Sequence, residues 1–283
     1  MTKKRWQKVR NRILLHVFFL GVISLTLIPI FYALTISLSG SNALLSSEFS
    51  FFPTRFTWEN YQRLFAEEPL ILWFSNTVIL AIATLTLALS FAIPSAYVLS
   101  RLRFKGRFSI FRGLILLNAF PAILSMFAIY RLFSNGPISL INTRLGLTLI
   151  YAGTMVMFAI LNLKGYFDTI PREIEDAARI DGASEWHVIS RIVLPLAKPA
   201  MVVTSVLILI FVWNEYIFAV TFMTGAENYT LAAGLFSLQA GEISGSWPLF
   251  TAAALLTSLP VLIVFLFIQK YMVSGLTVGG VKG

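Results

Sequence analysis

Six apolar stretches, each nearly free of charge, constrain this chain more than any other feature of its sequence. Each is close to the roughly 20 residues that an α-helix needs to cross the ~30 Å hydrocarbon core of a bilayer. We predict six transmembrane helices, over residues 13–38, 70–99, 109–132, 145–163, 200–224 and 250–269. The composition agrees, because 12% of residues are charged where a soluble domain has about 25%. An ordinary soluble enzyme, a disordered chain and a secreted disulfide scaffold are thereby excluded, and the predicted fold class is an all-α polytopic membrane protein.

The distribution of Lys and Arg predicts the orientation. Six helices place both termini on one side. With the N-terminus inside, the inner segments hold 18 of the 22 basic residues; these segments are 1–12, 100–112, 164–198 and 269–283. This bias follows the positive-inside rule, and attraction to anionic lipid headgroups is an alternative reason for it. We therefore expect a cytoplasmic basic N-terminus (1–12), a single membrane domain (13–283) and cytoplasmic ends. The net charge of +9 then reflects topology, and no nucleic-acid partner is expected.

The long inner segment 164–198 has the pattern of two short helices joined by a turn. Pro171 suits the first helical position, and acidic residues follow it near the positive end of the helix dipole. Gly182 can adopt the positive φ that ends a helix, and Ser184 can cap the next one. The segment is therefore either a docking element that projects into the cytoplasm or an amphipathic elbow resting on the bilayer.

Several residues of this segment carry a resemblance to a known family. Asp176-Ala177-Ala178, Gly182, Ile192 and Leu194-Pro195 resemble, in type and spacing, the EAA loop of binding-protein-dependent ABC importer permeases. Further stretches resemble the carbohydrate-uptake branch, and the chain's ending is similar to that of the smaller permease of maltose-type importers; these are Gly165-Tyr166-Phe167, Trp213-Asn214-Glu215, Tyr229-Thr230-Leu231 and residues 275–283. The departure is Asp176, where the family usually has Glu.

The resemblance implies a multisubunit importer in a bacterial or archaeal cytoplasmic (inner) membrane. Its other members would be a second permease, two ATPase subunits that bind ATP and Mg²⁺, and an external solute-binding protein. This chain has no Gly-x-x-x-x-Gly-Lys-[Ser/Thr] phosphate cradle, so we expect no enzymatic activity and no cofactor of its own. The cargo would be a sugar, such as a malto-oligosaccharide, with a different sugar or a polyol or uronate oligomer as the alternative.

In this interpretation the cytoplasmic segment couples the chain to the ATPase. Either Asp176 or Glu175 would pair with a basic residue of the partner. Trp186 would be either an interface anchor or a group that packs the loop onto the membrane helices. The coupling residues are predicted to be Glu175, Asp176, Ala177, Ala178, Arg179, Gly182, Trp186, Ile192, Leu194 and Pro195. ATPase closure would switch the permease between inward and outward access.

Polar residues within the spans are candidates for the translocation pathway. Glu215 is the one acidic residue inside a predicted span, and such residues usually face the bundle or a water-filled cavity. The candidates are Asn76, Asn118, Tyr130, Asn214 and Glu215. Hydrogen bonding between helices is the alternative role for each of them.

Two further segments resemble contact regions of the family by position. The Gly- and Ser-containing loop would touch the solute-binding protein through Gln239, Gly241, Glu242, Gly245 and Trp247, unless it is an ordinary connector. The tail would contact the ATPase pair through Gly279, Gly280 and Lys282, unless it is a frayed end.

Other function classes lack the residues that they need. An ion-coupled secondary transporter would need a relay of paired ionisable residues in the spans, and Glu215 is the one acidic residue there. A membrane enzyme would need a catalytic constellation, which the sequence does not show. The two histidines, His16 and His187, are too few and too far apart for a metal site, and there is no cysteine.

Overall fold

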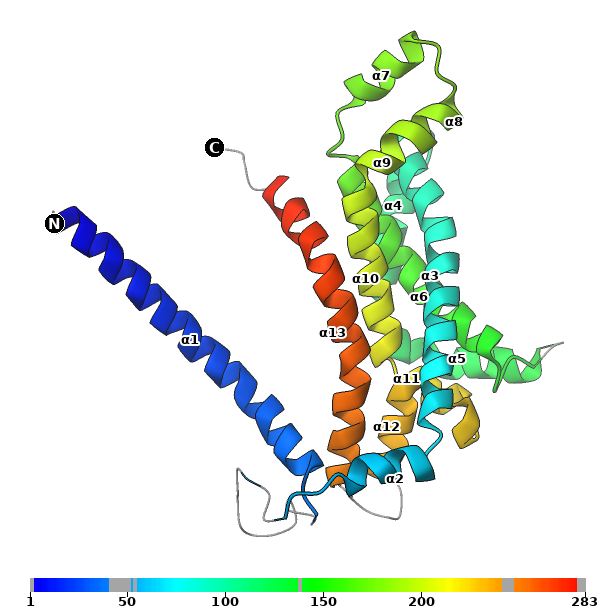
Figure 1. Ribbon diagram of the computed structural model, residues 1–283. Helices are drawn as coiled ribbons and strands as arrows, with labels where there is room; N and C mark the ends of the chain where they lie inside the picture. The colour runs from blue at the N-terminus through cyan, green and yellow to red at the C-terminus, as the bar shows by residue number, and fades with distance from the viewer. Residues whose placement is uncertain (1–2, 41–51, 53–54, 137–138, 241–246, 279–283) are drawn as a thin grey trace. The chain divides into compact units, whose positions relative to one another are not determined.

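The computed structural model describes residues 3–40, 52, 55–136, 139–240 and 247–278 (Figure 1). Most of these residues are helical, and the described part of the chain contains no strand beyond a single bridge that pairs Ser39 with Phe56. The elements are α1 Lys3–Ser37, α2 Glu59–Glu67, α3 Leu70–Arg101, α4 Arg107–Ala119, α5 Ala122–Asn135, α6 Arg144–Phe167, α7 Arg172–Ile180, α8 Glu185–Val188, η1 Ile189–Val193, α9 Leu194–Leu196, α10 Lys198–Asn214, α11 Ile217–Phe222, η2 Ala226–Asn228, α12 Leu231–Ala240 and α13 Trp247–Val278.

The chain divides into two compact units, of which the first takes in residues up to 68 and residues 235–258. Here α2 is fastened to the end of α1 by polar groups. The Tyr61 hydroxyl lies 2.8 Å from Ser37 Oγ, and the Asn60 side chain donates to the carbonyls of Ser37 and Ser39, each at 2.9 Å. These bonds satisfy carbonyls that the helix end leaves without intrahelical partners.

The second unit takes in residues 69–234 and the chain from 259 onward. Its frame consists of α3, α6 and α10, which pack against one another. Ala88, Ala92 and Ala96 repeat at intervals of four along α3 and are fully buried, as is Ala159 of α6. Residues four apart share one face of a helix, and small side chains let two helices approach closely. The alanine stripe thus explains why α3 and α6 lie side by side.

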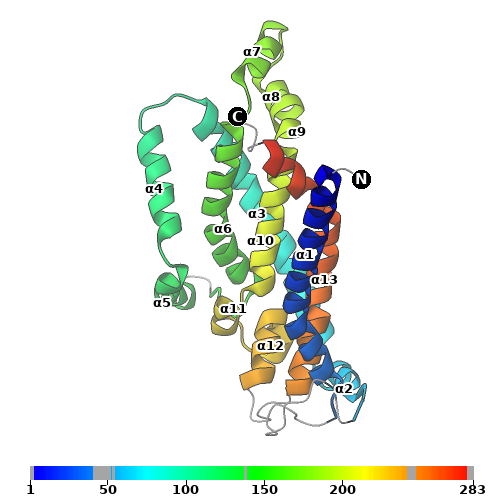
Figure 2. The same cartoon turned by 90° about the vertical axis from the view of Figure 1, so that its left-hand side faces the viewer.

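The predicted 109–132 stretch forms two helices instead of one. The axes of α4 and α5 differ by 92° across a break at Phe120–Pro121, and Figure 2 shows α4 beside α6 with α5 turning away from it. Proline lacks the amide hydrogen for a helical bond and disfavours helical ψ in the residue before it. Phe120 accordingly has an extended ψ of 127°.

Four helices in the described residues are long and apolar enough to cross a membrane, and the number reaches six if each of two bent helix pairs forms one span. The four lie within α1, α3, α6 and α13. The bent pairs are α4 with α5 and Glu185–Leu196 with α10. The structure therefore supports an all-helical membrane protein with four to six spans.

Candidate functional site

The predicted pair of short helices is present and extends beyond the ends of α3, α6 and α10 (Figure 1). We call residues 172–195 the projecting segment. Its first helix, α7, begins at Arg172, one residue later than predicted, because Pro171 has an extended ψ of 131° and precedes the helix. Glu173 and Glu175 lie in the first turn, where negative charge is favourable to the helix dipole.

The end of α7 confirms the predicted role of Gly182. Its φ is +86°, in the left-handed region, and a side chain at this position would find open space. The Ala183 amide donates to the Ala178 carbonyl at 2.9 Å and the Gly182 amide to the Arg179 carbonyl at 3.1 Å. This pair of bonds is the Schellman motif, which closes a helix and redirects the chain.

The second arm of the projecting segment starts with the predicted cap and returns to the core. The Ser184 hydroxyl accepts a hydrogen bond from the His187 amide at 3.3 Å, as an N-cap should. Val188 and Val193 are fully buried against the cluster that includes α3 and α6. The helical turns from 185 to 196 therefore anchor the segment through apolar packing.

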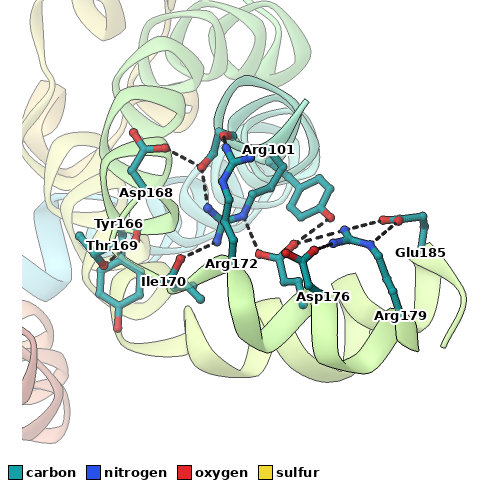
Figure 3. A network of polar contacts seen from close by, with 12 residues as sticks. Arg101, Tyr166, Asp168, Thr169, Ile170, Arg172, Asp176, Arg179 and Glu185 are labelled. Carbon is teal, nitrogen blue, oxygen red and sulfur yellow. Dashed lines mark hydrogen bonds and ion pairs between the residues drawn. The ribbon is translucent and has the colours of Figure 1, made fainter. Parts of the chain in front are cut away.

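A buried ion pair joins α7 to the end of α3. Among the described residues of α7, Glu175 is the one buried residue, with 2% of its side chain exposed. Its Oε1 lies 2.6 Å from Nε of Arg101, the last residue of α3, although the N–H is not aligned as in a hydrogen bond. The Tyr97 hydroxyl donates to Oε2 at 3.4 Å. The guanidinium of Arg101 also donates to the Ile170 carbonyl at 3.0 Å (Figure 3).

A second set of contacts fixes residues 168–171, the link between α6 and α7. The Ser100 hydroxyl donates to Asp168 at 2.6 Å, and Arg172 donates to the Ser100 carbonyl at 2.9 Å. Burial alone would raise the pKa of Asp168, but hydrogen bonds from Lys164 and Ser100 lower it below its ordinary value. Asp168 is therefore ionised at neutral pH and holds the end of α6 to the end of α3.

Arg179 ties the two arms of the projecting segment to each other. It donates to Asp176 at 2.9 Å and to both oxygens of Glu185, at 2.7 and 3.2 Å (Figure 3). Hydrogen bonding between Arg179 and Glu185 raises the pKa of the first and lowers the pKa of the second. Both groups stay charged at neutral pH, so the turn is cross-linked there.

The projecting segment exposes three large apolar side chains and one acidic side chain. Ile180 is 87% exposed and Trp186 75% exposed, while Ile174 is 42% exposed. The side chain of Asp176 is 65% exposed. Of the two alternatives for Trp186, packing onto the other helices does not occur in this structure.

The remaining predicted coupling residues divide between surface and core. Ala177 and Pro195 are exposed, and Ile192 is half-buried. Ala178 and Leu194 pack against the apolar cluster. The predicted residues thus do not form one continuous exposed patch.

Glu215 lies at a break between α10 and α11. Its carboxylate accepts hydrogen bonds from the Phe218 and Ala219 amides, at 2.9 and 3.3 Å, and from the Tyr151 hydroxyl at 2.6 Å. It thereby satisfies amides at the start of α11 that have no intrahelical partner. The neighbouring Asn214 is exposed and donates to the Ile210 carbonyl.

The other pathway candidates have dissimilar surroundings. Asn76 is buried, and its amide donates to the carbonyls of Glu227 and Tyr229 at 2.9 and 3.0 Å. Through these hydrogen bonds Asn76 connects α3 to η2 and to the residue that follows it. Asn118 is exposed, and Tyr130 contacts Phe222 edge-on.

Of the predicted outer loop, the structure describes Gln239, which is exposed, and Trp247, which is half-buried beside Phe250. Gly241, Glu242 and Gly245 lie outside the described residues, as do Gly279, Gly280 and Lys282 of the tail. The residues that the structure describes contain no group of three His, Cys, Asp or Glu side chains that could hold a metal ion.

Comparison with known proteins identifies the family. The protein-family model named "binding-protein-dependent transport system inner membrane component" matches residues 85–278. The chain belongs to this family. It is a multi-pass permease subunit, and the resemblance drawn from the EAA-like loop is confirmed.

Curated relatives match the permease over nearly its whole length. It is 34% identical to the inner membrane ABC transporter permease protein YcjP of Escherichia coli, with 92% of each chain covered. It is 34% identical to the maltodextrin transport system permease protein MdxG of Bacillus subtilis (98% of each). It is 32% identical to the maltose/maltodextrin permease MalG of Photorhabdus laumondii, over 99% of this chain and 97% of that entire protein.

Solved structures share the fold of the permease. A chain in the crystal structure of a bacterial ABC transporter involved in the import of alginate gives a TM-score of 0.72 at 24% identity. The match covers 96% of the permease and 98% of that chain.

Residues of the permease that the sequence did not single out hold the projecting segment in place. Arg101 and Tyr97 contact Glu175, Ser100 accepts from Arg172, and Asp168, which follows α6, accepts from Ser100. The sequence does place Arg101 at the inner end of an apolar stretch, but the positive-inside rule already accounts for a basic residue there. Nothing in the sequence indicates that its partner would be Glu175.

Proposed function

We propose that this permease is the membrane subunit of an ATP-driven importer for an oligosaccharide, and that its projecting segment docks an ATPase subunit. The single observation that carries the docking role is that a segment extending beyond α3, α6 and α10 exposes the large apolar side chains of Ile174, Ile180 and Trp186, as well as Asp176. Aromatic and apolar groups of this kind supply the anchors of protein interfaces. The positive-inside bias supports placing this segment in the cytoplasm.

The burial of the two neighbouring carboxylates supports Asp176 as the group that meets the ATPase. The side chain of Glu175 is 2% exposed and is paired with Arg101, whereas that of Asp176 is 65% exposed. A basic residue of the partner could therefore approach Asp176 in competition with Arg179. The Schellman turn at Gly182 and the Arg179–Glu185 cross-link would keep the two arms rigid enough to transmit movement.

The wider assembly follows from the family. A second permease, two ATPases that bind ATP and Mg²⁺, and an external solute-binding protein would complete the importer. Relatives named for maltodextrin and galacto-oligosaccharide transport support an oligosaccharide as the cargo. Closure of the ATPases would draw on the projecting segment and switch the permease between inward and outward access.

The docking role is tested by charge reversal. In a purified complex, Asp176→Lys places a like charge opposite the partner's cation, and we expect ATPase association to weaken about tenfold or more. Glu59→Lys makes the same charge change at an exposed position on α2 and should leave association unchanged. Equal association of the Asp176→Lys complex and the wild type would refute the role of Asp176.

The cargo and energy source are tested in proteoliposomes that contain the whole importer. A maltodextrin-loaded binding protein should stimulate ATP hydrolysis, whereas a binding protein without ligand should stimulate it little. Uptake driven by an ion gradient in the absence of ATP would instead favour a secondary transporter. Stimulation by a uronate oligomer alone would move the proposal to an acidic oligosaccharide.

A further inference from the structure

The attachment of α7 to the rest of its unit is unusual, because its one buried side chain, among the described residues of α7, is a carboxylate. Glu175 and Arg101 are both almost fully buried, with side-chain exposures of 2% and 5%. Two apolar side chains of similar volume would hold a helix at least as firmly, since burying two charges carries a desolvation penalty. The pair therefore calls for a role other than stability, and fixing one arrangement is the role that such pairs best support.

Arg101 is placed to fix both the position and the direction of α7. Its Nε meets Glu175 on α7, while its Nη2 donates to the Ile170 carbonyl in the link before α7. The link is held again by Arg172, which donates to the Ser100 carbonyl. The end of α3 thus contacts α7 at Arg172 and Glu175 and contacts the residues before α7 at Ile170.

The charges continue outward from this pair. Glu175 Oε2 lies 3.5 Å from Arg179, which bonds the exposed Asp176 and Glu185. The contacts therefore run from the exposed Asp176 and Glu185, through Arg179 and Glu175, to Arg101 in the last turn of α3. Because α3 packs along α6 and α10, a displacement of α7 reaches the helical frame through this contact as well as along the backbone.

We propose that Arg101 and Glu175 are positioning residues that transmit movement of the docked α7 to the end of α3. This inference rests on the proposed docking role of the projecting segment. Its distinguishing feature is geometry: the guanidinium reaches Glu175 and the Ile170 carbonyl together. A lysine ammonium keeps the charge but lacks this planar fork. Breaking the contact should uncouple hydrolysis from transport without detaching the ATPase.

The test uses the complete importer carrying Arg101→Lys or Glu175→Gln. Two quantities are measured: the ATPase that co-purifies with the permease, and the amount of substrate imported per ATP hydrolysed. We expect wild-type co-purification and a fall of about tenfold or more in the import-to-hydrolysis ratio. The matched control is Arg63→Lys, which alters a partly exposed arginine that also pairs through Nε, with Glu67. The import-to-hydrolysis ratio of this control should equal that of the wild type.

A wild-type ratio in both assembled variants would overturn the proposal. A wild-type complex that carries no ATPase would instead show that the proposed function has failed. If either variant does not accumulate as a complex, the double variant Arg101→Met with Glu175→Leu replaces it, because it leaves no buried charge unpaired. A reduced ratio in the assembled double variant supports the proposal, and a wild-type ratio or failure to assemble overturns it.

Discussion

Replacing Gly182 by valine tests the turn of the projecting segment by backbone conformation alone. Gly182 has a φ of +86°, and an added Cβ would meet nothing within 4 Å. The substitution therefore creates no clash. Its cost is that of holding an L-residue in the left-handed region, about 1–2 kcal/mol, with a β-branched residue at the unfavourable end.

The cost can be measured by hydrogen exchange at Ala183. The amide of Ala183 donates to the Ala178 carbonyl across the turn, so it exchanges when the turn opens. A loss of 1–2 kcal/mol should raise the exchange rate about 5- to 30-fold. In the reconstituted importer we also expect uptake to fall while ATP hydrolysis continues.

Two further variants serve as controls. Gly182→Asn should cost less, because asparagine tolerates this conformation better than other residues with a side chain. Gly165→Ala adds a Cβ in open space within a helix, where alanine is favoured, and should leave the exchange of Ala183 unchanged. If the Ala183 amide exchanges as slowly in Gly182→Val as in the wild type, the reasoning is refuted.

Three other predictions concern the polar ties and the packing of the second unit. Hydrogen bonding by Arg179 lowers the pKa of Glu185 below its ordinary value of 4.5. The Arg179–Glu185 ion pair should therefore stabilise the turn above pH 4.5, and this stabilisation should be lost as the pH falls through the lowered pKa. The carbon-13 chemical shift of the Glu185 carboxyl would follow the titration. Gly234→Ala would place a Cβ 2.2 Å from the buried ring of Trp73, and overpacking of this kind should cost about 1–3 kcal/mol and lower Tm. Asn76→Ala leaves two carbonyls without their donor and should cost about 1–3 kcal/mol, lowering Tm without changing which substrate stimulates hydrolysis.

Each of these predictions has its own control. Arg179→Gln should move the titration of Glu185 back toward 4.5, and no movement would contradict the assigned cause. Gly153→Ala, where a Cβ has open space, should not lower Tm, so an equal loss in both glycine variants would argue against overpacking. A changed substrate preference in Asn76→Ala would instead support the predicted place of Asn76 in the translocation pathway.

The membrane-embedded part of the fold was predictable because lipid leaves so few choices. A long uncharged stretch must satisfy its own backbone hydrogen bonds, which a helix does, and α3 and α6 follow the predicted stretches closely. The turn of the projecting segment was equally predictable, because Gly182 and Ser184 act through hydrogen bonds to near neighbours in the sequence.

The bends and the long-range contacts were not predictable in the same way. Pro121 interrupts a helix, whereas Pro94 lies inside α3 without breaking it, so the presence of a proline does not by itself predict a break. The depth of Glu215 predicts a pathway residue or a structural tie, but its bonds to Phe218, Ala219 and Tyr151 depend on the break between α10 and α11, which the sequence does not predict. The pairing of Arg101 with Glu175 joins residues far apart in sequence, and no local pattern specifies it.

Cross-linking from the projecting segment tests the central claim most directly. The chain contains no cysteine, so a single cysteine at the exposed Ile180 would be the one reactive thiol of the permease. In the assembled importer, a thiol-reactive cross-linker at this position should join the permease to the ATPase, and more efficiently when nucleotide is present. Cross-linking to lipid or to the second permease, with none to an ATPase in any nucleotide state, would contradict the account.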